Sequence, residues 1–272
     1  MISAIVPSFK NPQCLEICVK SFLDTQTTNG ELICIIDGFA DMYEEMASKY
    51  IDNPLVKFAV NENNKGMQFS TNLGVYYAIN PWVLIVNEDN VFPKNWDSIL
   101  LNQMKKNIVI SPNQIERDES IFQFITYNFG TIDNFRYADF LEIEPTLREY
   151  NGLTNDGETF PFCISKKLFM AVGGFDLIYP SPFVCDWDFF LKLELLDIQF
   201  YRTRELNFYH FGSMSTKNSS NKEDAKYLRN SESVASQVFA QKWGFDPIIQ
   251  RPSNSHKPDS KEMIRGINYY EE

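Results

Sequence analysis

The chain has 272 residues, of which 44% are hydrophobic and 22% charged, the balance of an ordinary globular protein with a substantial core. Its 36 acidic residues outnumber 25 basic ones, and the net charge of −11 argues against a general nucleic-acid binder, because phosphate groups require a basic surface. The same charge argues against anionic membranes as partners, and no apolar run approaches the ~18 residues of a transmembrane helix.

The cysteines are expected to be reduced and buried. The chain has five, an odd number, and Cys14 and Cys18 lack the second Cys or His pair that would complete a zinc site. The N-terminus begins a strand almost at once, without the basic and apolar regions of a signal peptide. These features lead us to expect a cytoplasmic protein.

Strands and helices alternate over roughly the first third of the chain. Apolar runs predict strands at Ile2–Val6, Leu32–Ile36, Val56–Val60 and Trp82–Val86, and amphipathic periodicity predicts helices around Leu15–Leu23, Asp41–Tyr50 and Met67–Ala78. This alternation predicts a parallel, doubly wound sheet with right-handed crossovers.

Polar residues follow each of these strands at what should be one edge of the sheet. They are Pro7-Ser8, Asp37-Gly38, the loop from Asn61 to Gly66, and Glu88-Asp89. Open α/β sheets bind ligands beyond the carboxyl ends of their strands. Glu88 and Asp89 supply oxygen ligands suited to Mg²⁺ or Mn²⁺, although the same residues also suit a turn and helix cap. Neither the dinucleotide-binding nor the P-loop glycine motif occurs, so those two site classes are unsupported.

The second part of the chain is less regular. A helix is predicted at 96–104 and a strand at 108–110, but from Ser111 to Asn155 the period is lost, and we expect loops and small strands there. Beyond this segment the patterns predict a strand at 160–164, helices at 166–172 and from Cys185, short strands at 199–203 and 206–209, a polar loop at 215–224 and a helix at 224–243.

Two features of this second part could carry chemistry. Asp186 and Asp188 stand two apart at a predicted helix start, so they do not share a helical face and should not act as a dyad. We expect one to face a site while the other caps the helix or pairs with a basic residue; alternatively, both are acids favoured by the helix dipole. His210 follows a predicted strand, where it is either a metal ligand or a residue satisfied within the fold. A divalent ion held by carboxylate and imidazole groups would neutralise a leaving diphosphate, and a separate carboxylate would deprotonate an incoming hydroxyl.

Short segments spread from Met1 to Gly244 carry a family resemblance by their order and spacing. They are Ala4–Lys10, Ile35–Gly38, Asn64–Gly66 with Asn72–Gly74, Asn87–Asp89, Gly173–Asp176, Cys185–Asp188, Tyr209–Ser213 and Gln241–Gly244. In this order the chain resembles the family 2 glycosyltransferases of the GT-A fold, especially the rhamnosyltransferase-like branch. Residues 111–155 match no part of the pattern.

The resemblance implies a Rossmann-like three-layer α/β/α sandwich with a mostly parallel central sheet. Residues 1–245 would form one domain, with a nucleotide-sugar binding half at 1–110 and an acceptor and catalytic half at 111–245, followed by a tail at 246–272. The implied activity is an inverting, Mn²⁺- or Mg²⁺-dependent transfer of a sugar from a UDP-, GDP- or dTDP-linked donor. The acceptor would be a hydroxyl of a glycan, glycolipid or protein, and the location the cytoplasm or the surface of a membrane that holds the acceptor.

The resemblance also implies roles for the matching residues. Asp186 would be the general base, and Asp89 and His210 would hold the metal. The donor would be contacted by six residues: Pro7, Phe9, Asp37, Gly66, Asn72 and Glu88.

The chain departs from the family pattern at three positions. Cys185 replaces the acidic residue that usually precedes the base, Asn87 stands where many members carry Asp, and Phe39 stands where Ser is usual. These departures leave open a catalytically degenerate protein that binds nucleotide sugars or carbohydrates. A nucleotidyltransferase is a third hypothesis, but the glycine-rich basic opening loop that it would need is missing.

Overall fold

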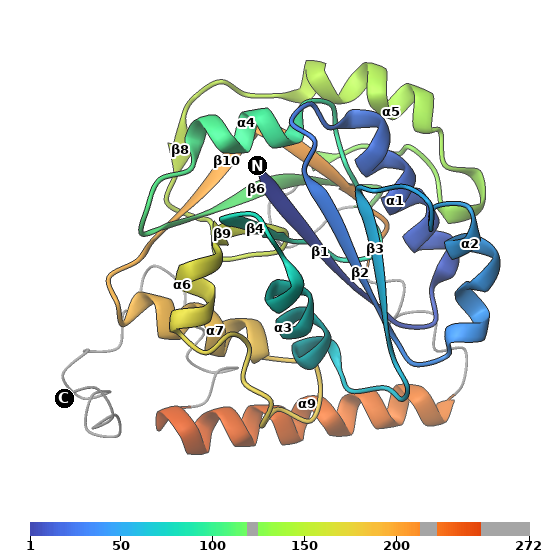
Figure 1. Cartoon of the computed structure of the whole chain (residues 1–272). Coiled ribbons are helices and arrows are strands. Elements are labelled where there is room, and N and C mark those ends of the chain that lie inside the picture. Colours follow the sequence, from blue (N-terminus) through green and yellow to red (C-terminus); the bar gives the residue numbers. More distant parts are fainter. Residues whose placement is uncertain (119–124, 213–221, 246–272) are drawn as a thin grey trace.

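The computed structural model describes residues 1–118, 125–212 and 222–245, with side chains from residue 230 in the last of these ranges (Figure 1). Its strands are β1 (Ile2–Ser8), β2 (Glu31–Asp37), β3 (Val56–Asn61), β4 (Trp82–Ile85), β5 (Asn90–Val91), β6 (Ile108–Glu116), β7 (Ile125–Thr126), β8 (Leu153–Thr154), β9 (Phe162–Ser165) and β10 (Gln199–His210). Its helices are α1 (Pro12–Thr25), α2 (Glu44–Ser48), α3 (Met67–Tyr77), α4 (Trp96–Gln103), α5 (Tyr137–Ile143), α6 (Lys166–Ala171), α7 (Cys185–Glu194) and α9 (Lys222–Trp243), with 3-10 turns η1 (Ala40–Tyr43), η2 (Ile132–Asn134) and η3 (Glu144–Leu147).

One mixed sheet runs through the described part of the molecule, in the order β3-β2-β1-β4-β9-β6-β10-β5. β1 pairs in parallel with β2 and β4, and β2 pairs in parallel with β3. β9 lies antiparallel between β4 and β6, and β6 pairs in parallel with β10. The predicted mostly parallel sheet is confirmed, and β9 is an antiparallel strand inside it.

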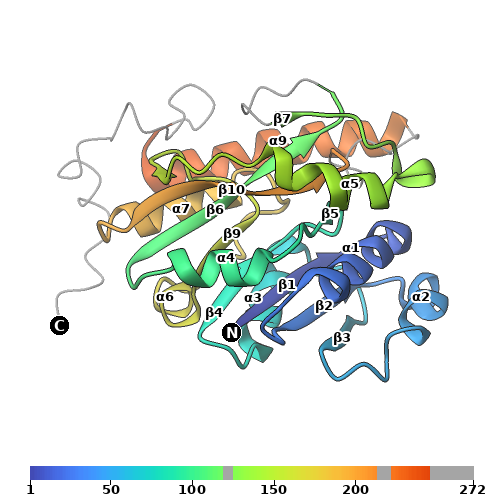
Figure 2. The ribbon, with the colours of Figure 1, turned by 90° about the horizontal axis from the view of Figure 1, so that it is seen from above.

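Two buried apolar clusters cover the two faces of the sheet. Because side chains alternate along a strand, Ile5 of β1 belongs to the cluster with α3, α7 and α9, whereas Ala4 and Val6 belong to the cluster with α1 and α4. Figures 1 and 2 show α1, α4 and α5 along one face and α3, α6, α7 and α9 along the other. The predicted three-layer sandwich is confirmed.

Residues 111–155 hold more regular structure than expected. β6 continues past Ile110 to Glu116 through polar residues that are buried, and Asn113 Nδ2 donates to Asn207 Oδ1 of β10 at 3.0 Å. The sequence predicts only the start of this strand, at 108–110. Its later side chains are polar but buried and bonded to a neighbouring strand, so they show no alternation of polar and apolar residues. β6 also crosses residue 110, so the expected halves 1–110 and 111–245 share one sheet.

The remaining predicted elements agree with the structure with small differences. The two short strands expected at 199–203 and 206–209 are one strand, β10, with a register shift between Thr203 and Asn207. The segment 111–155 also contains helix α5, which the sequence did not predict. Most of the polar loop expected at 215–224 and all of the tail at 246–272 lie outside the described residues. Among the helices in the described ranges, none is both long enough and apolar enough to cross a bilayer.

Candidate active site

The ends of β2 and β3 are joined through Asp37. Its Oδ1 accepts hydrogen bonds from Asn61 Nδ2 and from the backbone N–H of Lys65, and its Oδ2 accepts one from the N–H of Gly66, all at 2.8 Å. Gly66 has a φ of +91°, a conformation that glycine adopts without strain. Asp37 and Gly66, both predicted donor-binding residues, are thus brought together, and Asp37 fixes the loop that precedes α3.

The ends of β1 and β4 are joined through Glu88. The N–H of Phe9 donates to Glu88 Oε2 at 2.9 Å, and Asn11 Nδ2 donates to Oε1 at 3.1 Å. Burial raises the pKa of the Glu88 carboxyl to about 8, against the opposing effect of hydrogen bonds from Ser8, Asn11 and Phe9. Pro7 lies two residues before Phe9, paired with β2. Predicted donor residues from β1 and β4 therefore meet at this edge.

An aromatic pair with a lysine lies where β1 and β2 end. The rings of Phe9 and Phe39 make an edge-to-face contact at 5.7 Å, and Phe39 is 49% exposed. Lys10 Nζ lies 5.1 Å from the centroid of the Phe9 ring and 4.4 Å from that of Phe39. Partly exposed aromatic rings suit stacking of a nucleobase, so Phe39, a departure from the family pattern, adds a platform beside Phe9.

Asp89 and His210 meet across the antiparallel pairing of β5 with β10. His210 pairs in register with Asn90, and its Nε2 lies 3.4 Å from Asp89 Oδ1. Its other ring nitrogen, Nδ1, lies 2.7 Å from Glu116 Oε1 at the end of β6. Burial alone would lower the pKa of His210, but the carboxylates of Asp89 and Glu116 raise it to about 10. The two predicted metal ligands are therefore adjacent, held by strands far apart in sequence.

Asp89 and His210 offer two side-chain atoms that could bind a divalent metal. Within the described residues, no three His, Cys, Asp or Glu side chains converge as a ready-made metal site. Asp89 supplies a carboxylate oxygen, and His210 would supply an imidazole nitrogen once Nε2 gives up its proton to the incoming ion; Mn²⁺ accepts both ligand types. Glu116 engages the far nitrogen of His210, the arrangement that orients metal-bound histidines. The pair fits part of a metal site, whose remaining positions would fall to substrate oxygens or water.

Asp186 lies in the first turn of α7 and is partly buried. Burial raises the pKa of its carboxyl to about 6, although hydrogen bonds from the backbone N–H groups of Trp187 and of Asp186 itself oppose the rise. In the described part of the chain, no hydrogen bond or ion pair links Asp186 with Asp89 or His210. The structure thus does not bring the predicted base into contact with the predicted metal ligands.

Asp188 has a different environment from Asp186. It is fully buried, and its Oδ1 accepts hydrogen bonds from Lys242 Nζ at 2.6 Å, Trp243 Nε1 at 2.8 Å and Tyr179 Oη at 2.9 Å. The expectation that one aspartate of the pair would bind a basic residue is confirmed. These contacts tie the start of α7 to the end of α9.

Asn72 connects α3 to the turn after α6. Its Nδ2 donates to the carbonyl of Phe175, and its Oδ1 accepts from the N–H of the same residue, both at 2.8 Å. Both polar groups of this predicted donor-binding side chain are therefore engaged by the backbone of Phe175.

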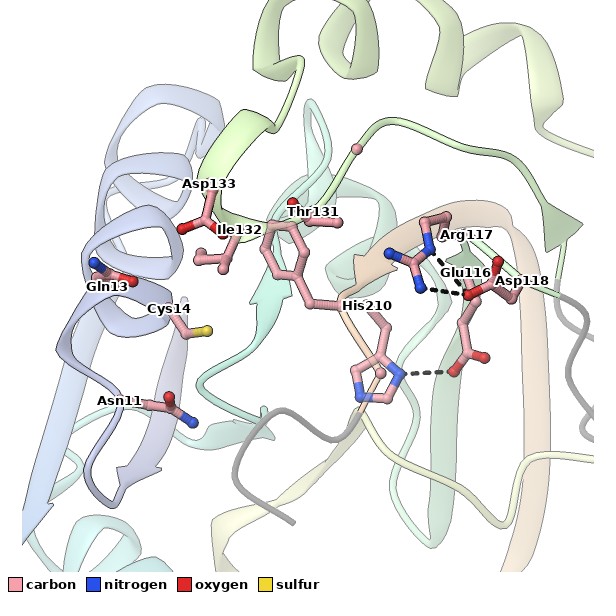
Figure 3. A pocket seen from close by; sticks show the side chains of 13 residues that line it. Asn11, Gln13, Cys14, Glu116, Arg117, Asp118, Thr131, Ile132, Asp133 and His210 are labelled. Atoms are coloured by element: carbon pink, nitrogen blue, oxygen red, sulfur yellow. Dashed lines mark hydrogen bonds and ion pairs between the residues drawn. The ribbon is translucent and has the colours of Figure 1, made fainter. Parts of the chain in front are cut away.

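A cavity of about 540 Å³ borders His210. Figure 3 shows Asn11, which precedes α1, and Gln13 and Cys14 of α1 on one side, with Asp133 above them, and Glu116, Arg117 and Asp118 at the end of β6 on the other. His210 and Cys14 both line the cavity, and the charges of Asp89 and Glu88 add to burial in raising the pKa of the Cys14 thiol. The sequence did not single out Glu116, Arg117, Asp118 or Asp133, because they fall in the segment without periodicity.

Comparison with protein families places most of the chain in one group. Residues 3–192 match the family model described as Glycosyl transferase family 2.

Curated relatives with partial similarity carry related names. Glycosyltransferase GlyG of Streptococcus pneumoniae is 28% identical over 134 residues, which are 48% of this chain and 44% of that protein. An uncharacterized glycosyltransferase of Haemophilus influenzae is 24% identical over 198 residues, 71% of this chain and 62% of that protein. In both relatives the match covers less than two thirds of the relative's own length.

Solved structures share the architecture at low sequence identity. GalNAc-T7, solved with UDP, GalNAc and Mn²⁺, superposes with a TM-score of 0.60 at 15% identity, over 77% of this chain and 43% of that one. S. aureus TarS 1-349 in complex with UDP gives a TM-score of 0.55 at 15% identity, over 91% and 73%. At this identity the likeness concerns the fold, and it is the fold expected from the sequence.

Proposed function

The chain belongs to glycosyl transferase family 2 and has the GT-A fold, and from this premise we propose that it transfers a sugar from a nucleoside-diphosphate sugar to an acceptor hydroxyl. The observation that carries the proposal is the meeting of Asp89 and His210 at 3.4 Å, beside the strand ends that hold Phe9 and Asp37. A carboxylate and an imidazole at a ligand-binding sheet edge suit a metal-bound diphosphate.

The donor's nucleoside half is proposed to lie against the ends of β1 and β2. Phe9 and Phe39 offer aromatic surface for the base, and Pro7 lines the same strand end. Asp37 and Gly66 hold the loop before α3, which lets the donor approach the backbone there. The neighbours solved with UDP support a nucleoside diphosphate, and UDP-, GDP- and dTDP-sugars are all candidates.

Asp89 and His210 are proposed to hold Mn²⁺ or Mg²⁺, with Glu88 close to the metal and the donor ribose. The bound ion would offset the negative charge that develops on the departing nucleoside diphosphate. Glu116 orients His210 so that Nε2 faces Asp89. The Mn²⁺ seen in the GalNAc-T7 structure supports this choice of metal.

Asp186 is proposed to take the proton from the acceptor hydroxyl. Its raised pKa of about 6 makes Asp186 a stronger base than an ordinary aspartate. At neutral pH the Asp186 carboxyl is still mostly ionised, so it can accept a proton. The deprotonated oxygen attacks the anomeric carbon from the face opposite the leaving diphosphate, which inverts the configuration. Asp186 and the Asp89–His210 pair make no direct contact, as this reaction requires, because the acceptor hydroxyl and the donor sugar would have to lie between the base and the metal.

The acceptor is proposed to be a glycan, a glycolipid or a protein, and the reaction to take place in the cytoplasm or at a membrane that holds the acceptor. All five cysteines are free and buried, which agrees with a reducing compartment.

A donor screen tests the proposal. The protein is incubated with UDP-, GDP- and dTDP-sugars, and both thermal stabilisation and release of the nucleoside diphosphate are measured with Mn²⁺ and then with chelator. We expect one donor class to stabilise the protein and to be hydrolysed slowly only with metal.

Asp186→Asn should keep donor binding and lose transfer, and NMR of the anomeric proton should show inversion. Equal activity in chelator would contradict the metal assignment, and normal turnover by Asp186→Asn would contradict the base.

A binding protein without catalysis is the second candidate. Cys185 occupies the position of the acid that usually precedes the base, and its thiol is fully buried and donates to the carbonyl of Pro182. Burial raises the pKa of this thiol, so it cannot replace the missing carboxylate. Donor stabilisation without any hydrolysis or transfer would favour this candidate.

A further inference from the structure

The cavity beside His210 has walls that none of the proposed donor residues supplies. One wall is the end of β6, with Glu116, Arg117 and Asp118, and another is the turn Gly130–Asp133 that leads into η2 (Figure 3). The ring of His210, the proposed metal ligand, lies between Glu116 of the first wall and Asp89. A molecule in the cavity would therefore lie beside His210, between the end of β6 and the residues at the start of α1.

The turn that forms one wall is rigidly built. Gly130 has a φ of +106°, and a Cβ there would lie 2.6 Å from the carbonyl oxygen of Asn134. Tyr209 Oη donates to the carbonyl of Gly130 at 2.8 Å, and the Thr131 N–H donates to Asn134 Oδ1 at 2.7 Å. These contacts fix the backbone that presents Ile132 and Asp133, so this wall is formed before any ligand binds.

Of the three carboxylates that line the cavity, two are engaged by neighbouring side chains and one can bind a ligand. Glu116 is paired with His210, and Asp118 accepts two hydrogen bonds from Arg117, at 2.9 and 2.6 Å. Asp133 has no hydrogen-bond or ion-pair partner among the described residues. A carboxylate accepts strongly from hydroxyl or ammonium groups and repels anions.

The cavity also contains an aromatic ring held in place. Phe211 lines it, and edge-to-face contacts with Phe135 and Tyr209, at 5.0 and 5.1 Å between centroids, fix its orientation. Ligand pockets of this size combine such apolar surface with a few polar groups that set orientation. An aromatic ring together with a carboxylate and the amides of Asn11 and Gln13 matches a sugar, which has an apolar C–H face and a rim of hydroxyl groups.

From these walls we infer that the cavity binds the acceptor as a neutral or amino sugar ring, with Asp133 accepting hydrogen bonds from its hydroxyl or ammonium groups, and that it excludes acceptors with a carboxylate or phosphate on that ring. The inference rests on the proposed function, and it adds the class of acceptor and the residues that select it.

Binding of simple sugars to the full chain, measured by ligand-observed NMR with UDP and Mn²⁺ present, tests the inference. The probes are methyl glucoside, methyl galactoside and N-acetylglucosamine as neutral rings, glucosamine as a cation, and glucuronic acid and glucose 6-phosphate as anions. We expect at least one neutral or cationic ring to bind and both anions to fail. Asp133→Asn should weaken binding about tenfold, as for loss of a hydrogen bond to a charged group, and reduce the discrimination against glucuronic acid.

Glu142→Gln is the matched control, since Glu142 is an exposed acid of α5 in the same segment but outside the cavity. It removes the same charge and should bind sugars like the wild type. With a turnover assay, Asp133→Asn should raise the KM for the acceptor about tenfold and leave the KM for the donor unchanged.

Three results overturn the inference: the wild type binds none of the neutral or cationic rings, Asp133→Asn behaves like Glu142→Gln, or Asp133→Asn raises the KM for the donor instead. The proposed function fails in a different way, because it fails when no nucleotide sugar is bound or hydrolysed, whatever the simple sugars do.

Discussion

His210 contacts two carboxylates, and Glu116 is the one that orients it. Because an ionised carboxylate only accepts hydrogen bonds, the bond at 2.7 Å places a proton on Nδ1 and directs Nε2 toward Asp89. Glu116 lies in the segment where sequence patterns gave no guidance, and no motif identifies it. Its importance follows from the structure alone.

Glu116→Ala is expected to weaken Mn²⁺ binding by about 10- to 100-fold, the usual cost of losing the partner of a metal-bound histidine. The reason is that the imidazole loses its fixed orientation while both proposed ligands remain. Isothermal titration of Mn²⁺ into the protein with UDP measures the effect. Glu142→Ala, which removes an acid outside the site, should bind Mn²⁺ normally, and equal affinities of the two variants would refute the role of Glu116.

The carboxyl of Asp186 is expected to make the stability of the protein depend on pH. Its pKa is raised from 3.8 to about 6, so the folded state binds this proton more tightly than the unfolded state does. The protonated Asp186 carboxyl contributes fully to the free energy of unfolding below about pH 4, and this contribution is lost as the pH rises through about 6. Asp186→Asn is therefore expected to raise the free energy of unfolding at pH 8 by at most about 3 kcal/mol, and with it the melting temperature. At pH 4 the substitution should have little effect. Calorimetry at the two pH values checks this, and a variant that is destabilised at pH 8 would contradict it.

The same pKa gives an expected pH dependence of activity. A general base must be deprotonated, so kcat/KM of the wild type should fall about tenfold per pH unit below about pH 6. A pH series with the best donor measures the profile. A rate that stays constant down to pH 5 would exclude Asp186 as the base.

At the scale of elements, α9 is anchored to α7 through Asp188. This carboxylate is fully buried, and Lys242 bonds both to it and to Asp176, at 2.6 and 2.7 Å. The anchor fixes the first turn of α7, where Asp186 lies two residues away. The resemblance pointed to the Lys242-Trp243 segment, but the sequence alone presents it as the end of a packed helix.

Lys242→Met is expected to lower the free energy of unfolding by about 3 kcal/mol, because it removes the closer of the two cations beside the buried Asp188 carboxylate and leaves only Lys192, whose Nζ lies 3.7 Å from Oδ2. Urea denaturation measures the loss. Lys49→Met is the control, since Lys49 pairs with Glu16 at the surface, where solvent screens the pair, and its loss should cost much less. If both variants lose the same small amount, the anchor does not stabilise the fold.

Elements with a strong period could be predicted from the sequence, whereas polar or short elements could not. β1 to β4 are apolar and the helices between them are amphipathic, so their order and approximate ends followed directly. β6 could not be followed past Ile110, because its later residues are polar and satisfied inside the sheet. The antiparallel direction of β9 depends on its neighbours β4 and β6, which local sequence does not specify.

The candidate site was predictable where residues follow strands. Asp37, Glu88, Asp89 and His210 all come at or just after strand ends, and the structure gathers them into three contact groups at the sheet edge. Asp133 and Glu116 belong to residues whose pattern has no period. Both line the cavity that borders His210, a position that only the three-dimensional structure shows.

At the scale of the whole molecule, the two expected halves are parts of one sheet. β9, from the second half, lies between β4 and β6, and β6 itself crosses the expected boundary at residue 110. We therefore propose that residues 1–245 unfold together. Thermal unfolding followed by both circular dichroism and tryptophan fluorescence should give one coincident transition, and a fragment of residues 1–110 should not fold alone. Two separate transitions, or a folded 1–110 fragment, would show that the halves are independent domains.

The pairing of β5 with β10 has a consequence for synthesis on the ribosome. Asp89 and His210 are 121 positions apart, and at translation rates of about 5–20 residues per second the second appears on the order of ten seconds after the first. During this interval the nascent chain already carries Glu88 and Asp89 at the end of β4, but neither His210 nor the strand that pairs with β5. The proposed metal site is thus completed late, by a returning strand, after the parallel strands β1 to β4 have been synthesised.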